Sequence, residues 1–452
     1  MATDLTKAVQ KNAGNDAITK MTFSAWIKRS KLGEATIFTA HQLSSYRTEF
    51  YFNSDDALIL YSFINSSTAA NVVTKRVFRD TNAWYHIMLV VDSTLATTND
   101  RIKFYVNGVR ETEMDGSQTH PSQNSSFGQF NDTGATLHIG DTPSRTAFEG
   151  VMSHVHYTPY TAYDGSAFGE TDATTGEWKI KTSPSVTYST AGFFILKDGN
   201  SVTDQSGNSN NFTVASGDLT KTEDNPSNIY ATANPLVRNQ VTITTANLTV
   251  RSPNSNWMGI PATLGVESGK WYWEYKLALG NAWSQCGVMS SKPSGGYDSI
   301  YSTYVGNNSG GLALNSGNGD FYHDGSSGAY GTSAWFSGGL AEYDIIGVAL
   351  DATNSKIWFA KNGTWGNSSN PSTGSGGIDF SGDTDFTNHK PYLPAFSVHN
   401  CILTLNFGNG HLGTAEITTN GGNGFQDTDG NGRFYYAVPT NYRGLSTKGL
   451  NA

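Results

Sequence analysis

The sequence predicts an all-β protein built from β-sandwiches, and three observations support this fold class. Of the 452 residues, 49 are Gly and 12% are aromatic, which suits short strands joined by tight turns. Residues 342–364 hold two runs with apolar residues at every second position, separated by a turn at 351–355 and followed by Asn362 and Gly363. Asn and Gly accept the positive φ of hairpin turns. Helical periodicity is nearly absent, so we expect successive hairpins.

Charge and hydropathy limit the partners. Only 15% of the residues are charged, the formal net charge is -9, and no run of Lys and Arg occurs. This argues against nucleic acid, whose phosphates require clustered basic side chains. No stretch is apolar enough to enter a membrane, and residues 1–14 lack the hydrophobic centre of a signal peptide. We therefore expect synthesis in a cytoplasm and no membrane insertion.

The first 20 residues differ from the rest of the chain. Leu5, Ala8 and Val9 fall at helical spacing, and Gly14 with Asn15 would end a helix. We expect a short helix or an N-terminal arm over residues 1–20. The arm could dock onto a larger particle or could be a frayed terminus, and the sequence leaves both readings open.

Residues 21–200 form the first predicted domain. Its strands carry, in order, a Phe-x-x-Trp motif, Trp-Tyr-His before Asp92, Phe-Tyr-Val-Asn-Gly, an Ile-Gly-Asp turn and a Phe-x-Gly motif. These strands are expected at 21–29, 84–92, 101–110, 136–141 and 148–161. Their order resembles the laminin-G-like, concanavalin A-like family. The resemblance implies an antiparallel jelly-roll sandwich and leaves calcium open as a cofactor, with no ligands assigned.

Residues 201–240 are the predicted linker. They contain few apolar residues and many Asn, Ser, Asp and Gly. The part at 204–214 is similar to a turn that closes laminin-G-like domains of phage proteins. We therefore expect that part to pack on the first domain.

Residues 241–452 form the second predicted domain. The motif Gly-Lys-x-Tyr-Trp-Glu lies at 269–274, Gly-Val-x-Leu-Asp at 347–351 and Leu-x-Leu-Asn-Phe-Gly at 403–408. Together they resemble the SPRY domain, and residues 434–450 are similar to its closing segment in large marine phage proteins. The resemblance implies a second antiparallel jelly-roll sandwich, used for binding.

Aromatic residues in the loops of the second domain are the candidate ligand contacts. The rings pack on the C–H face of a sugar, while neighbouring Asn, Asp and Ser bind its hydroxyls. Any one of these aromatics could instead belong to the core. The candidates are Trp283, Tyr297, Tyr301, Tyr304, Tyr322 and Trp335.

One acidic turn has part of a calcium-loop pattern. Asp427, Asp429 and Asn431 place oxygen ligands at positions 1, 3 and 5, followed by Gly432. The Glu expected at position 12 is replaced by Val438. A calcium site and a solvated turn both remain open, and no other cofactor is expected.

The residues for catalysis are not grouped in the sequence. Glycoside hydrolysis requires two nearby carboxylates, yet Glu49, Glu177 and Glu274 are isolated. His138, His154 and His156 are interpreted as surface histidines of a sheet. Cys286 and Cys401 lie in apolar strand patterns and are expected to be unpaired core residues. We therefore predict a protein that is not an enzyme.

The tandem arrangement resembles structural proteins of tailed phages, marine ones in particular. The resemblance implies a virion surface protein, made in the host cytoplasm, that contacts other capsid or tail proteins. It would act as a capsid knob or fibre, or as a tail-fibre component, and bind host-surface or environmental glycans. One alternative is a capsid decoration protein that cements capsomers and binds no sugar. Another is an intracellular SPRY scaffold that binds a peptide.

Overall fold

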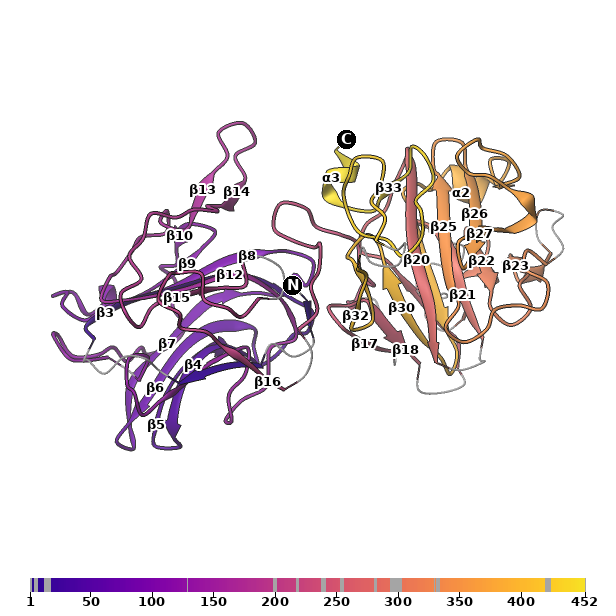
Figure 1. Ribbon diagram of the computed structural model, residues 1–452. Helices are drawn as coiled ribbons and strands as arrows, with labels where there is room; N and C mark the ends of the chain where they lie inside the picture. Colours follow the sequence, from indigo (N-terminus) through magenta and orange to yellow (C-terminus); the bar gives the residue numbers. More distant parts are fainter. Residues whose placement is uncertain are drawn as a thin grey trace. The chain divides into compact units, whose positions relative to one another are not determined.

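In the computed structural model the chain forms two compact units, and nearly all of its regular elements are β-strands (Figure 1). The predicted all-β fold class is confirmed. The first unit comprises Met1–Lys221 and Asn225–Ser227, and the second comprises Thr222–Asp224 and Asn228–Ala452. The structure describes residues 2–3, 7–11, 18–127, 129–197, 201–216, 219–236, 241–252, 256–279, 283–292, 303–328, 330, 334–418 and 424–451. No helix within these ranges has the length and apolar character that a membrane crossing requires.

In the described residues of the first unit, two seven-stranded antiparallel sheets are formed. The β3 sheet has the order β1 (Ala2–Thr3), β12 (Gly150–Pro159), β3 (Lys20–Arg29), β8 (Tyr85–Asp92), β9 (Ile102–Val106) and β10 (Val109–Arg110), and β15 (Phe193–Ile195) also pairs with β12. The β5 sheet has the order β16 (Thr213–Ser216), β2 (Lys7–Lys11), β11 (Thr136–Ile139), β4 (Ala35–Leu43), β5 (Tyr46–Phe52), β6 (Ala57–Ile64) and β7 (Ser67–Val77). A separate ribbon joins β13 (Gly169–Thr171) to β14 (Trp178–Ile180).

Aromatic rings fill the core of the first unit. Phe23 of β3 stacks on Phe38 of β4 at 4.6 Å between ring centroids, and Phe38 stacks on Phe130 at 4.5 Å. On β5, Phe50 and Phe52 are fully buried. Because side chains alternate along a strand, the intervening positions lie on the opposite face of the sheet.

The N-terminal segment is part of a sheet, so the helix expected over residues 1–20 is wrong where the structure describes it. Strand β2 pairs with β11 on one side and with β16 on the other. Each of the five residues pairs with at least one neighbouring strand, and Ala8 and Val9 pair with both, which outweighs a weak helical spacing. Residues 7–11 are therefore an inner strand of the first unit.

Much of the segment expected to be a linker also belongs to the first unit. Asp204 Oδ1 accepts hydrogen bonds from the backbone N–H of Phe194 and of Ser206, and its Oδ2 accepts one from that of Asn210. Residues 213–216 form β16. Asn, Asp and Ser, which suggested a linker, here close turns by bonding to the backbone. Further along, Tyr230 is buried in the second unit. The boundary between the two units in the sequence therefore lies at residues 221–228.

In the described residues of the second unit, most strands belong to two large and mainly antiparallel sheets. The β20 sheet has the order β17 (Thr242–Thr244), β18 (Thr249–Arg251), β30 (Ile402–Asn406), β20 (Lys270–Leu279), β25 (Ile345–Asp351), β26 (Lys356–Lys361) and β27 (Thr364–Trp365), with β28 (Ile378–Asp379) beside β26 and β33 (Arg443–Gly444) parallel to β20. The β21 sheet has the order β19 (Met258–Pro261), β29 (Tyr392–Val398), β21 (Ser284–Ser290), β22 (Gly311–Asn315), β23 (Phe321–His323) and β24 (Ser326–Ser327).

Short elements complete the two units. They are η1 (Thr98–Asp100) in the first, and η2 (Val305–Asn307), η4 (Gly366–Ser368), α2 (Thr384–Thr387), α3 (Thr447–Leu450) and the β31 (His411–Leu412) and β32 (Ala415–Glu416) ribbon in the second.

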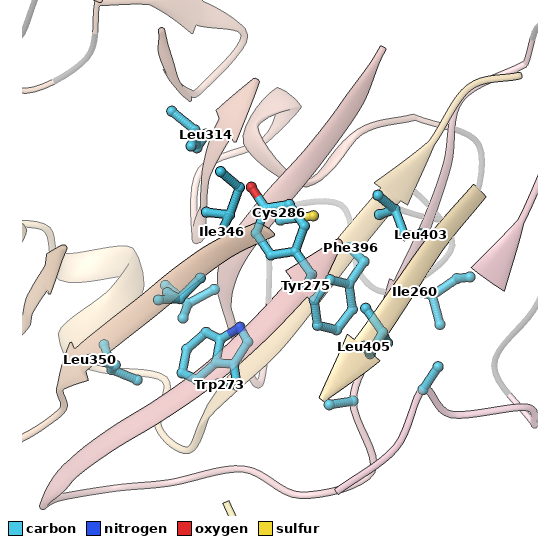
Figure 2. Close-up of a cluster of buried hydrophobic side chains, with 14 of the residues drawn as sticks. Ile260, Trp273, Tyr275, Cys286, Leu314, Ile346, Leu350, Phe396, Leu403 and Leu405 are labelled. Atoms are coloured by element: carbon cyan, nitrogen blue, oxygen red, sulfur yellow. The ribbon is translucent and has the colours of Figure 1, made fainter. Parts of the chain in front are cut away.

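The predicted hairpin at 342–364 is confirmed as β25 and β26, with Asn362 at φ 50° and Gly363 at φ 81°. The core between the two sheets contains Trp273 and Tyr275 of β20 together with aliphatic residues of the neighbouring strands (Figure 2). Cys286 and Cys401 are both buried and free, as predicted.

Candidate functional site

The predicted aromatic contacts do not share one environment. Trp335 is 4% exposed, and its indole N–H donates to the carbonyl oxygen of Phe359 at 2.8 Å. The prediction that Trp335 contacts a ligand is wrong, because its indole is packed inside the sandwich and its N–H is already hydrogen-bonded there. Tyr297 and Tyr301 lie outside the described residues.

Two of the predicted residues, Tyr304 and Tyr322, meet in an aromatic cluster with Trp257 and His399. The ring of Tyr304 lies 5.2 Å from that of Trp257 and 5.9 Å, edge to face, from that of Tyr322. Trp257 also lies 5.2 Å from the imidazole of His399. All four side chains are partly exposed. We call Trp257, Tyr304, Tyr322 and His399 the aromatic cluster.

Strand register and one pinned turn place these rings together. Met258 of β19 pairs with Val398 of β29, so Trp257 and His399 are the next residues beyond that pair. Tyr322 follows Phe321, which is fully buried, and alternation turns the tyrosine to the outer face.

Tyr304 immediately precedes η2, and two hydrogen bonds fix that turn on the β21 sheet. The backbone N–H of Val305 donates to Ser397 Oγ at 2.8 Å, and that of Gly306 donates to Gln285 Oε1 at 3.1 Å. The position of Tyr304 is therefore set by buried polar contacts rather than by the rings alone.

Trp283 extends this surface. Its side chain is 49% exposed, and its indole lies against Gly317, where an added Cβ would come within 3.3 Å of the ring. The next residue, Asn318, donates from Nδ2 to the hydroxyl of Tyr322 at 3.2 Å. A continuous series of contacts thus joins Trp283 to the aromatic cluster.

The chemistry of this surface suits a ligand with both C–H faces and hydroxyls. Burial, and then the neighbouring Tyr322, raise the pKa of Tyr304, so its hydroxyl stays a neutral donor near pH 7. Among the described residues, Nδ1 of His399 has no hydrogen-bond partner. Trp257 and His399 were not among the predicted contacts, because only the register of β19 with β29 brings them together.

The acidic turn at residues 427–432 uses its carboxylates within the protein. Oδ1 of Asp427 accepts hydrogen bonds from the backbone N–H of Asp429 and Asn431, and its Oδ2 accepts one from that of Gly444. Asp429 pairs with Arg443. In the part of the chain that the structure describes, no three His, Cys, Asp or Glu side chains are grouped as metal ligands.

Two strand glutamates are fully buried. Glu49 Oε2 lies 3.0 Å from Arg145 Nε and 3.5 Å from Arg47 Nε. Glu274 accepts hydrogen bonds from the backbone N–H of residues 435 and 436, from Asn406 Nδ2 and from the Tyr272 hydroxyl, at 2.8 to 3.1 Å. Burial raises the pKa of Glu274 to about 7, although these four donors oppose the shift. Both carboxylates are therefore bound by groups of the protein itself.

The expectation of surface histidines is wrong for His138 and His156. His156 is 1% exposed, stacks on Phe194 at 3.9 Å and exchanges a hydrogen bond with the Tyr188 hydroxyl at 2.8 Å. Burial lowers its pKa well below the usual value. The register of β12 with β3 shifts between residues 153 and 156, and sequence alternation cannot reveal such a bulge.

A buried Ser24–His86 pair in the first unit lacks the arrangement of a nucleophile and its base. Nε2 of His86 lies 2.8 Å from Ser24 Oγ, while Trp178 Nε1 donates to His86 Nδ1 at 3.0 Å. A neutral imidazole that accepts at Nδ1 carries its proton on Nε2 and therefore donates to the serine. Burial lowers the pKa of His86 to about 3, which keeps it neutral.

Comparison with protein families agrees with this architecture. Residues 4–163 match the family model of the concanavalin A-like lectin/glucanase superfamily that carries the laminin G name, and residues 270–410 match the SPRY domain model. The chain carries a laminin-G-like domain followed by a SPRY domain. No curated protein matches the chain.

Several solved structures are similar to parts of the chain. The SPRY domain of human HERC1 is 15% identical, with a TM-score of 0.29, over 38% of this chain and 96% of that one. The SAP-like pentraxin of Limulus polyphemus is 17% identical, with a TM-score of 0.26, over 36% of this chain and 75% of that one. Domain 4 of the extracellular arabinanase AbnA from Geobacillus stearothermophilus, solved with arabinotriose, is 17% identical, with a TM-score of 0.24, over 33% of this chain and 65% of that one.

Proposed function

We propose that this chain is a non-catalytic binding protein whose SPRY domain recognises glycans through the aromatic cluster and Trp283. The observation that carries the proposal is a partly exposed set of rings held by buried hydrogen bonds at one end of the β21 sheet. Rigid rings lose little conformational entropy on binding, and adjacent amide and imidazole groups supply hydrogen bonds to hydroxyls. The same end presents Trp283 to solvent.

We further propose that the protein acts on the surface of a tailed-phage virion, where it is placed after synthesis in the host cytoplasm. The support is the resemblance of the tandem laminin-G-like and SPRY domains, with their low charge, to phage structural proteins. In this setting the protein is a capsid knob or fibre, or a tail-fibre component, and its ligands are host-surface or environmental glycans. Immunogold labelling of purified phage particles tests the location.

The absence of catalysis is also part of the proposal. Glu49 and Glu274 are both enclosed by protein donors, and the Ser24–His86 pair is buried with the serine as acceptor. None of these groups is arranged to attack a sugar or an ester. Incubation with the glycan that binds, followed by mass spectrometry, should return that glycan intact.

Binding to an array of bacterial surface polysaccharides tests the main proposal. Tyr322→Ala and Trp283→Ala should each weaken binding by about 1 to 2 kcal/mol, the scale of a lost aromatic contact, with little change in melting temperature. Tyr343→Ala is the matched control, because Tyr343 is 61% exposed and its ring lies 5.2 Å from Lys276 Nζ rather than on the aromatic cluster. Full binding by both variants would refute the site, and absence of any bound glycan would favour the capsid decoration alternative.

A further inference from the structure

A row of four charged side chains crosses one end of the β20 sheet. Lys270 pairs in register with Asp351, Asp351 with Lys356, and Lys356 with Asp379. Directly paired residues point to the same face of a sheet. The four therefore form one row of alternating charge, which we call the charged row.

The charged row borders a pocket of about 580 Å³ that is open to solvent. Its other walls are the turn at 353–355, the loop at 372–374 and Ser381, which supply hydroxyl and amide groups. This volume lies within the range of small-molecule sites, about 300 to 1,000 Å³. The size is sufficient for a ligand, and the lining is polar.

The acceptors of the charged row are fixed. Oδ1 of Asp351 accepts from the Asn354 backbone N–H at 3.0 Å, and Oδ2 accepts from Asn354 Nδ2 at 2.9 Å. Oδ1 of Asp379 accepts from the backbone N–H and the hydroxyl of Ser381 at 3.0 and 2.6 Å. Both carboxylates are therefore oriented before any ligand arrives.

The donors of the charged row are held more loosely. Lys270 Nζ lies 3.8 Å from Asp351, and Lys356 Nζ lies 3.5 Å from Asp379, both longer than a typical charge-assisted hydrogen bond of about 2.8 Å. About a third of each lysine side chain is exposed. A hydroxyl, which both donates and accepts, can therefore bridge an ammonium and its carboxylate.

Among the described residues that line the pocket, the one aromatic side chain is not exposed for stacking. Trp358 is fully buried, and its Nε1 donates to the carbonyl oxygen of Ser375 at 2.9 Å. A Cβ added to Gly377 would come within 2.3 Å of this indole, so the glycine lets the loop close over it. Recognition in this pocket therefore depends on hydrogen bonds.

We propose that this pocket binds a neutral polyhydroxy ligand, a segment of an uncharged glycan. An anionic ligand would approach two fixed carboxylates, and a cationic ligand would approach two ammonium groups. An uncharged sugar meets neither penalty, and each of its hydroxyls matches a donor and an acceptor in the charged row. The ligand class follows from the alternation of charge.

This site is separate from the aromatic cluster. At one end of β29 the hydroxyl of Tyr392 lies 3.1 Å from Ser355 Oγ, in the turn that borders the pocket. At the other end, Val398 pairs with Met258, next to Trp257 and His399. Seven residues of strand span about 20 Å. The inference therefore does not depend on the proposed function.

Saturation-transfer difference NMR on the full chain tests the inference with three probe classes. The neutral probes are maltotriose, cellotriose and mannotriose, the anionic probe is trigalacturonate, and the cationic probe is chitosan trimer. We expect transfer to at least one neutral trisaccharide and none to the charged probes. Lys356→Met and Thr373→Trp, which remove a donor and fill the pocket, should each reduce that signal at least tenfold.

Two controls make the result decisive. Lys179→Met breaks a Lys–Asp pair of 3.2 Å in the first unit and should leave the signal unchanged. Tyr322→Ala serves as the reference for the aromatic cluster, because a signal that this variant alone removes belongs to that cluster and not to the pocket. The inference would be overturned by a transfer signal that persists in both pocket variants or that disappears only in Tyr322→Ala. It would also be overturned by a stronger signal for a charged probe, or by no signal from any trisaccharide at 10-fold molar excess or more. Circular dichroism melting confirms that each variant is folded.

Discussion

Glu49 in the first unit and Glu274 in the second are both strand glutamates with no exposed surface, yet their surroundings differ. Glu49 contacts cations, Arg145 and Arg47, together with the hydroxyl of Ser144. Glu274 contacts no cation among the described residues and accepts hydrogen bonds from four neutral donors instead. The difference shows that burial alone does not define the role of a carboxylate.

The two arrangements also hold different parts of the chain. Arg145 follows β11, and it connects Glu49 to Glu34 while its guanidinium lies 3.7 Å from the ring centroid of Tyr51. Glu274 instead fixes the backbone at residues 435 and 436, which covers the outer face of the β20 sheet. One carboxylate organises charged side chains, and the other organises a closing segment.

The largest effect is expected for Glu274→Ala. The substitution leaves two backbone N–H groups and the Tyr272 hydroxyl without their acceptor, and it removes one of the two acceptors of Asn406 Nδ2. This should cost about 4 kcal/mol of unfolding free energy. Glu274→Gln, which keeps one acceptor oxygen, should cost less. Urea unfolding, with hydrogen exchange of peptides from residues 269–279, measures the loss of stability in both variants. Equal losses would show that the number of donors left without an acceptor does not set the loss.

The pH dependence of Glu274 is expected to be next in size. Its pKa is raised to about 7 from 4.5, so the folded protein holds a proton that the unfolded chain releases between these values. The stabilisation is complete below about pH 4.5 and is lost as pH rises toward 7, by about 3 kcal/mol in all. Unfolding at steps from pH 4.5 to 8 should show this fall, and Glu274→Gln should flatten it.

Arg145→Met should have a smaller effect in the first unit. The buried carboxylate of Glu49 still contacts Arg47 at 3.5 Å and the Ser144 hydroxyl, so its negative charge remains partly stabilised. We expect a loss of about 2 kcal/mol, below the usual cost of leaving a buried charge unpaired. A loss larger than that of Glu274→Ala would reverse the comparison.

The smallest effect is expected for Lys31→Met. Lys31 pairs with Glu149 at 2.7 Å, but 59% of its side chain is exposed. Water and salt weaken such a pair, so the urea midpoint of the first unit should not change measurably. A clear loss of stability would show that surface ion pairs matter in this fold.

Local patterns predicted the parts of the fold that depend on neighbours in the chain. The hairpin of β25 and β26 follows from alternation and from Asn362 and Gly363, because these signals lie within one short segment. Glu274 was identified through its strand motif. Its four donors were not, since they come from β30, from the closing segment and from another residue of the same face.

The candidate site was predictable only in part, for the same reason. Tyr304, Tyr322 and Trp283 could be named from aromatic loops, whereas Trp335 has the same loop composition and is core. Trp257 becomes a neighbour of Tyr304 only because β19 pairs with β29, about 140 residues further along the chain, and β29 also holds the turn that follows Tyr304. The charged row likewise depends on the register of four strands, and no single segment of the sequence contains it.

The position of β2 between β11 and β16 has a consequence for how the protein is made. Residues 7–11 leave the ribosome well before their two partners, which are residues 136–139 and 213–216. The first unit cannot complete this sheet until residue 216 has been synthesised, so β2 waits with unpaired backbone groups. Pairings of such long sequence separation form slowly and expose the nascent chain to association. Chaperone demand during synthesis should therefore fall only after residue 216 has left the exit tunnel.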